Sequence, residues 1–130
     1  MIVAGIGCRK GTSSAEIEAA VDAALMTCGL ARARLDALAT HASKRDEPGI
    51  CALADGLQLR LLAFTAEEMA RHAPNVETVS QRVVELMGVP SVAEASALAG
   101  AGRGSRLLAP RISHEGATCA IAEGEGESRP

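Results

Sequence analysis

The stretch Met1-Ile2-Val3-Ala4-Gly5-Ile6-Gly7-Cys8-Arg9-Lys10-Gly11-Thr12-Ser13 decides the fold. The run from Ile2 to Ile6 is too short and too apolar for a solvated surface, so it predicts a buried strand. Gly5, Gly7 and Gly11 then allow the backbone to bend tightly and to come close to a ligand. The sequence therefore predicts a strand that ends in a glycine-rich turn.

A helix start follows this turn directly. Ser13 is a preferred N-cap residue, and Glu16 three residues later completes a capping-box pattern. The free amide groups of the helix's first turn then point back towards the loop that carries Arg9 and Lys10. The helix dipole, the amides and the two cations together predict an anion-binding site. We expect its ligand-binding residues to be Gly5, Gly7, Cys8, Arg9, Lys10, Gly11, Thr12 and Ser13.

This turn could also be a nucleotide-binding loop or an ordinary connection between a strand and a helix. The pattern lacks the third glycine of a dinucleotide fingerprint, and Lys10 is not followed by Ser or Thr in the frame of a P-loop, so it indicates no nucleotide site. The remaining alternative is an ordinary strand-to-helix turn with two solvated basic residues, because glycine-rich turns are common.

Composition limits the class of ligand. A chain of 130 residues fits one domain. It is 48% hydrophobic but 1% aromatic, without Trp or Tyr, so stacking on nucleic-acid bases is nearly excluded. A formal net charge of −3 argues against a polyanion-binding surface and leaves room for a local cationic pocket. We expect a small anionic ligand and no nucleic-acid partner.

The four cysteines are scattered at Cys8, Cys28, Cys51 and Cys119, with no Cys-x-x-Cys pair, so we predict no metal site and no cofactor. They are typical of reduced thiols. Beside Arg9 and a helix start, Cys8 could have a lowered pKa and react as a nucleophile; the alternative is a structural role. The apolar run at the start is too short for a signal peptide or a membrane span, so we expect a cytoplasmic protein without a membrane partner.

Helices and strands alternate along the rest of the chain. Apolar periodicity and capping signals predict helices over 14–30, from the segment 43–49 to Gly56, over a short stretch after Thr65, weakly over 75–87, and over 91–100. Strands are predicted over 35–40, 57–64, 107–112 and 117–122. Residues 123–130 have no apolar residue to bury, so we expect a domain over 1–122 followed by a disordered acidic tail.

This order of elements predicts the α/β class: a layered α/β/α domain with a mixed, largely parallel sheet and an antiparallel edge. Parallel sheets bind ligands beyond the carboxyl ends of their strands. We therefore expect the loop Gly5–Ser13, the segment Thr40–Pro48 and the turn Phe64–Glu68 to open on one side.

Four blocks in this order carry a family resemblance: Gly5–Thr12, Asp46–Gly49, Thr65–Glu68 and Gly88–Ala95. The sequence resembles the CobE and CbiG carboxyl-terminal domain family of cobalamin (vitamin B12) biosynthesis, and is closest to the stand-alone CobE form. It departs from the family at Pro110-Arg111, where the family looks like Pro-Lys, and in its longer acidic tail.

The resemblance implies a protein that binds or carries a precorrin or corrinoid intermediate in the oxygen-dependent pathway, with other cobalamin-pathway enzymes as further partners. Such intermediates bear many carboxylates around a large apolar ring, which suits Arg9 and Lys10. The alternative implied by the family is a hydrolase acting on a precorrin-5-type intermediate, with lactone opening and acetaldehyde release as in CbiG. The sequence lacks the other CbiG domain, so that activity does not simply carry over.

A hydrolase needs a general base within reach of water. The candidates are Asp46 and Glu47, with His41 and His114 as further titratable groups. None of them has a second acid or base at a sequence spacing that is typical of a catalytic pair. For Asp46 and Glu47, the alternative is a helix-start role, since both precede Pro48 and complement the helix dipole.

Overall fold

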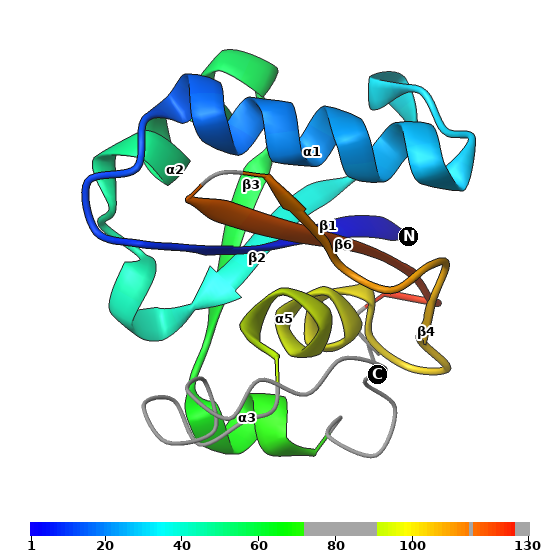
Figure 1. Cartoon of the computed structure of the whole chain (residues 1–130). Coiled ribbons are helices and arrows are strands. Elements are labelled where there is room, and N and C mark those ends of the chain that lie inside the picture. The colour runs from blue at the N-terminus through cyan, green and yellow to red at the C-terminus, as the bar shows by residue number, and fades with distance from the viewer. Residues whose placement is uncertain (72–90, 115, 127–130) are drawn as a thin grey trace.

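One mixed sheet lies between two layers of helices in the computed structural model, which describes residues 1–71, 91–114 and 116–126 (Figure 1). The predicted helix over 75–87 falls outside these residues. The elements in chain order are β1 (Ile2–Cys8), α1 (Ser14–Cys28), β2 (Ala37–His41), α2 (Pro48–Leu57), β3 (Arg60–Phe64), α3 (Ala66–Ala70), α5 (Val92–Ala101), β4 (Arg106–Leu107), β5 (Ile112–His114) and β6 (Ala117–Glu123). Among the described residues, no helix has the length and apolar character needed to cross a bilayer.

The strand order is β3-β2-β1-β6-β4, with β5 also paired to β6. The strands β1, β2 and β3 are parallel, whereas β6 runs antiparallel to β1 and β4 and β5 run antiparallel to β6. The predicted class, a layered α/β domain with a mixed sheet and an antiparallel edge, is confirmed.

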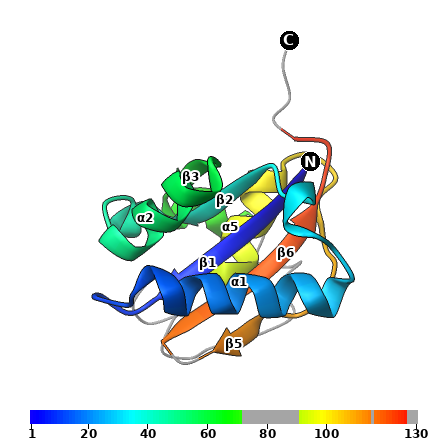
Figure 2. The same ribbon diagram turned by 90° about the horizontal axis from the view of Figure 1, so that it is seen from above.

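The face under α1 and α2 is filled by large aliphatic side chains. Figure 2 shows α1 lying across the sheet on this side. The helix begins at the predicted N-cap, where the Ser13 hydroxyl accepts a hydrogen bond from the Glu16 amide, and it ends at Gly29 in the left-handed conformation. Ile17 and Val21 of α1 and Ile50 of α2 are fully or almost fully buried on this face. Burying this stripe is what fixes the two helices on the sheet.

The opposite face, under α5, is built of small residues. Its buried cluster is Val3, Ala37, Ala39, Ala93, Ala97, Leu98, Ala101, Ala120 and Ala122. Because alanines line both surfaces, α5 can approach the sheet closely. At Gly5 the approach is so close that an added Cβ would lie 2.0 Å from the Ala93 carbonyl oxygen.

The strand predicted over 107–112 is interrupted. It forms β4 and β5 on the same edge of β6, joined by residues 108–111. Pro110 has no N–H to give to a sheet. The Arg111 amide donates to the buried Glu94 carboxylate at 3.1 Å rather than to β6. Pro110 and Arg111 therefore interrupt the hydrogen bonds to β6. Glu94 at the start of α5 holds the segment that joins β4 to β5.

The prediction of a disordered tail from residue 123 is wrong for its first four residues. The Gly124 amide donates to the Met1 carbonyl at 3.0 Å, and the Gly126 amide donates to the Ala101 carbonyl at 2.7 Å. At the contact of Gly126 with Gly102, an added Cβ on Gly102 would lie 2.1 Å from the Gly126 oxygen. Backbone hydrogen bonds and two glycines order this segment without any apolar side chain, which is why an argument from apolar burial missed it.

Truncation after Ala122 is therefore expected to lower the thermal midpoint by several degrees. It removes the Gly124 and Gly126 hydrogen bonds, each of which contributes about 0.5–1.5 kcal/mol. Thermal unfolding followed by far-UV circular dichroism measures the change. Truncation after Gly126 is the control, because it retains both bonds and should leave the midpoint in place. Equal midpoints for the full chain and the shorter truncation would contradict the role given to these bonds.

Candidate functional site

The three predicted loops lie at one edge of the sheet. Because β1, β2 and β3 are parallel, the segments that follow Cys8, His41 and Phe64 all leave their carboxyl ends. The first two segments touch, since the Gly11 amide donates to Glu47 Oε2 at 3.0 Å. The start of α2 also packs on the first loop, because a Cβ on Gly49 would lie 2.2 Å from the Thr12 carbonyl oxygen.

Glu47 ties the two loops together. Its side chain is buried, with Oε2 accepting the Gly11 amide and Oε1 at 3.8 Å from the Lys44 ammonium. It is also the N-cap residue of α2, with Pro48 in the first turn, as the sequence predicted. Asp46 beside it is exposed, and among the described residues its side chain has no hydrogen-bond or ion-pair partner. The geometry thus gives Glu47 a positioning role.

The loop of residues 9–13 is held by hydrogen bonds within it and to Gly116. The Thr12 hydroxyl donates to the Arg9 carbonyl at 2.7 Å, and the Arg9 amide donates to the Gly116 carbonyl at 3.2 Å. Gly11 has φ +85° with nothing near its Cβ position, so this turn does require glycine. Within the described ranges the side chains of Arg9 and Lys10 form no ion pair, and both are exposed.

Gly5 and Gly7 have packing roles. A Cβ on Gly5 would strike the backbone of α5, and one on Gly7 would lie 2.8 Å from the Thr118 hydroxyl and 3.7 Å from Val92 Cβ. Both positions face neighbouring elements inside the protein. We therefore place them among the residues that let α5 approach the sheet, and leave them out of the candidate site.

The Cys8 thiol does not have the electrostatics of a nucleophile. Burial raises its pKa; the nearby Lys44 charge lowers it by a smaller amount, and Glu47 raises it again. The sequence suggested a lowered pKa for Cys8, and the structure shows the opposite direction. Cys8 packs against the core cluster under α1, which fits the structural alternative.

The two histidine candidates do not assemble an acid–base pair. His41 Nδ1 accepts a hydrogen bond from the Ser43 amide at 3.0 Å, and burial lowers the pKa of this imidazole. Burial therefore favours the neutral imidazole. His114 is exposed at the end of β5.

The two loops joined at Glu47 carry a group of cations. Arg9, Lys10, Lys44 and Arg45 come from two loops joined through Glu47, and we call them the cationic edge. They outnumber the two carboxylates of these two loops, Asp46 and Glu47, whereas the third segment at this edge adds Glu67 and Glu68. The amino end of α1 lies at the same loop and adds its dipole. The arrangement suits a ligand with several carboxylates.

Comparisons with known proteins agree with the family read from the sequence. The family model described as Cobalamin synthesis G C-terminus matches residues 2–122. Protein CobE of Sinorhizobium sp is 31% identical over 121 residues, which cover 93% of this chain and 79% of that protein. A crystal structure of CobE, a protein from the cobalamin (vitamin B12) biosynthetic pathway, superimposes with a TM-score of 0.91 at 36% identity, covering 98% of this chain and 93% of that one.

A more distant relative is an enzyme. Cobalt-precorrin-5A hydrolase of Priestia megaterium is 26% identical over 98 residues, which cover 75% of this chain but 26% of that enzyme. The predicted family resemblance is confirmed, and the chain belongs to the Cobalamin synthesis G C-terminus family of cobalamin biosynthesis proteins.

Proposed function

We propose that this protein binds a precorrin or corrinoid intermediate of cobalamin biosynthesis and carries it between enzymes of the oxygen-dependent pathway, without changing it chemically. The observation that supports the proposal is the cationic edge: Arg9 and Lys10 are exposed on a loop that internal hydrogen bonds and Glu47 hold in place. A carrier needs such a fixed, charged surface and needs no poised acid or base.

The ligand class follows from charge and shape. Intermediates of this pathway carry carboxylates around their ring, and cations spread over two loops can meet several of them at once. Arg9 and Arg45 offer planar donors for paired hydrogen bonds, whereas Lys10 and Lys44 act as point charges. The helix dipole at the start of α1 adds to the attraction.

The alternative function is hydrolysis of a precorrin-5-type intermediate, which the partial similarity to cobalt-precorrin-5A hydrolase favours. It requires a general base with access to water near the ring. Of the two carboxylates that the sequence offers, Glu47 is bonded to the Gly11 amide, and the exposed Asp46 has no partner among the described residues that would position it as a base. We therefore rank the carrier first.

The test replaces the loop cations. In Arg9→Ala, Lys10→Ala and the double variant, we expect the dissociation constant of a carboxylate-rich corrinoid such as cobyrinic acid to rise, by at least about ten-fold in the double variant. Titration followed by the visible spectrum of the ligand gives the constants. Arg34→Ala is the control, since it removes an exposed cation before β2, away from the carboxyl ends. Equal affinities for wild type and the double variant would overturn the proposal.

A further inference from the structure

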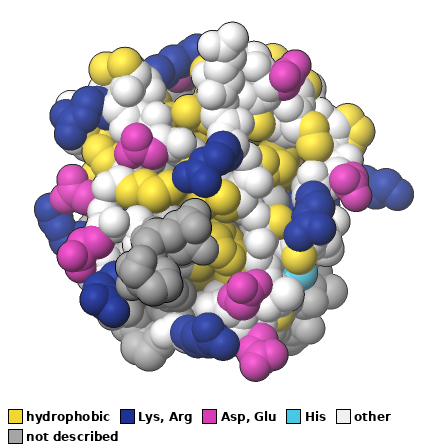
Figure 3. All heavy atoms as spheres, turned by 180° about the vertical axis from the view of Figure 1, so that it is seen from behind, with side chains coloured by type: hydrophobic (Ala, Val, Ile, Leu, Met, Phe, Trp, Pro, Cys, Tyr) yellow, Lys and Arg dark blue, Asp and Glu magenta, His cyan; other side chains and the backbone are white. Residues whose placement is uncertain are grey.

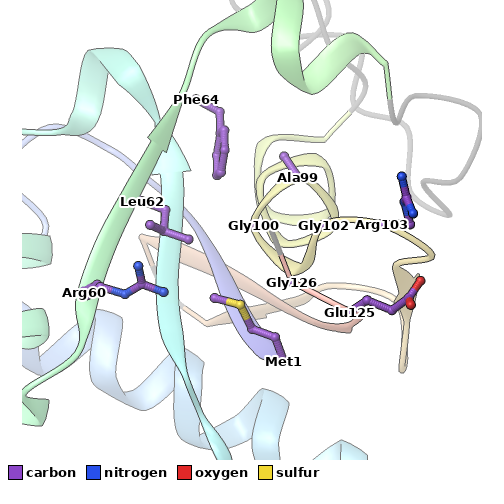
Figure 4. Close-up of a pocket in the computed structure, with 10 residues that line it drawn as sticks. All are labelled: Met1, Arg60, Leu62, Phe64, Ala99, Gly100, Gly102, Arg103, Glu125 and Gly126. Carbon is purple, nitrogen blue, oxygen red and sulfur yellow. The ribbon is translucent and has the colours of Figure 1, made fainter. Parts of the chain in front are cut away.

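A second candidate binding surface lies along the edge strand β3, on the side of α5. An open groove of about 560 Å³ runs between the edge strand β3 and helix α5 (Figure 4). On the side of the molecule opposite to that of Figure 1, exposed hydrophobic side chains lie among basic and acidic ones (Figure 3). The volume is within the range of small-molecule sites.

The groove is distinct from the cationic edge. It is lined by Met1, just before the amino end of β1, and by Arg60, at the amino end of β3. Arg9 and Lys10 follow the carboxyl end of β1. A strand of 7 residues is about 20 Å long at the usual rise, so the Met1 end of the groove lies roughly that far from Arg9. The other end of the groove reaches Phe64 at the carboxyl end of β3, where β3 contacts the segment 42–44.

The wall on β3 is apolar and partly open to solvent. Leu62 and Phe64 alternate along the strand and therefore share one face, and Ala99 of α5 lies across from them. Phe64 is the one aromatic residue of the sequence. An aromatic ring beside aliphatic side chains suits a flat apolar partner, because ring faces stack with an offset.

The polar groups of the groove stand on both of its sides. Arg60 projects from β3, while Arg103 and Glu125 lie on the far side, where the Glu125 amide donates to the Arg103 carbonyl at 2.9 Å (Figure 4). Both arginines are exposed, and neither guanidinium has an ion-pair partner among the described residues. Two cations against one carboxylate leave the groove positive and ready to pair with acidic groups.

From these features we propose that the groove is a second ligand site, which takes a planar, apolar organic acid. The flat body would lie against Leu62 and Phe64, and its carboxylates would pair with Arg60 and Arg103. The two surfaces differ in the ligands that suit them. The groove presents two cations on apolar walls and suits an apolar ligand with few carboxylates, whereas the cationic edge presents four cations on polar loops and suits a ligand with more.

The test uses protoporphyrin IX, a flat apolar ring with carboxylates at one edge, as the probe. The visible absorbance and fluorescence of the probe report its binding, because no amino-acid side chain absorbs in that range. We expect saturable binding by wild type and a dissociation constant raised about 10- to 100-fold in Arg60→Glu/Arg103→Glu. Arg34→Glu, the same charge reversal on an exposed arginine elsewhere, should keep the wild-type value. Far-UV circular dichroism confirms that each variant is folded.

The same double variant is titrated with cobyrinic acid to separate this site from the cationic edge. An unchanged corrinoid affinity together with the loss of protoporphyrin binding supports two independent sites. The proposal is overturned if wild type shows no saturable protoporphyrin binding, if Arg60→Glu/Arg103→Glu binds it as wild type does, or if the Arg34→Glu control loses as much. A parallel loss of corrinoid affinity would also overturn it, because the two surfaces would then form one site. If the groove does not bind protoporphyrin, the proposal for the cationic edge still stands, because the Arg9→Ala and Lys10→Ala variants test it separately.

Discussion

Gly5→Ala is expected to lower the free energy of unfolding by about 3 kcal/mol, the upper part of the range for overpacked cores. The new Cβ would lie 2.0 Å from the Ala93 oxygen and 2.6 Å from the Ala97 nitrogen, both backbone atoms of α5. Neither can move aside without shifting the helix. Denaturant unfolding followed by far-UV circular dichroism measures the loss, because the chain has no Trp or Tyr for fluorescence.

Gly56→Ala is the matched control for this substitution. Gly56 lies in α2, and an added Cβ would meet nothing within 4 Å. Alanine is the better helix former, so this variant should gain about 0.5–1 kcal/mol. If Gly5→Ala were as stable as wild type, the close approach of α5 to β1 would have to be relaxed in solution, and the packing role of Gly5 would be wrong.

Glu47→Ala is expected to cost about 1.5–3 kcal/mol of stability and to weaken corrinoid binding, because the Gly11 amide loses a charged acceptor and the loop loses its attachment to α2. Glu47→Gln keeps an oxygen acceptor and should lose less of both. Denaturant unfolding and corrinoid titration of the two variants measure these effects. Asp46→Asn is the control, since the exposed Asp46 side chain has no partner among the described residues.

The same variants decide between the carrier and the hydrolase. A carrier leaves precorrin-5 unchanged in wild type and in every variant. If wild type instead released acetaldehyde, and Glu47→Gln lost a factor of about 10²–10⁴ in rate while still binding the pigment, Glu47 would be a general base and the carrier proposal would be wrong.

Local signals in the sequence were sufficient for most of the fold. The N-cap Ser13 stands where the pattern predicted it, and the short helix predicted after Thr65 begins there, with a capping box between Thr65 and Glu68. These signals act within one helical turn, so they do not depend on how the rest of the chain packs. The strand over 107–112 was harder, because its interruption depends on Glu94, a residue that is distant in sequence.

The candidate site was only partly accessible to the same reasoning. A glycine in the sequence can allow either a ligand or a helix to come close to the backbone. The pattern alone therefore could not show that Gly5 and Gly7 pack against other elements of the protein while Gly11 shapes the loop. The buried tie between Glu47 and Gly11 has no local signature, since it joins residues that are 36 positions apart. The groove had none either, because residues from both ends of the chain line it.

The place of β6 beside β1 has a consequence for how the chain folds. Every residue pair between these strands joins positions more than a hundred residues apart, from Ile2 with Glu123 to Cys8 with Ala117. Such pairing gives a high contact order, and the entropy of closing so long a loop is lost before the contacts repay it. On the ribosome, β1 can pair with β2 early, but its other edge stays open until residues 117–123 have emerged. Completion of the sheet therefore waits for the synthesis of β6, and a nascent chain that stops short of β6 exposes the edge of a buried strand.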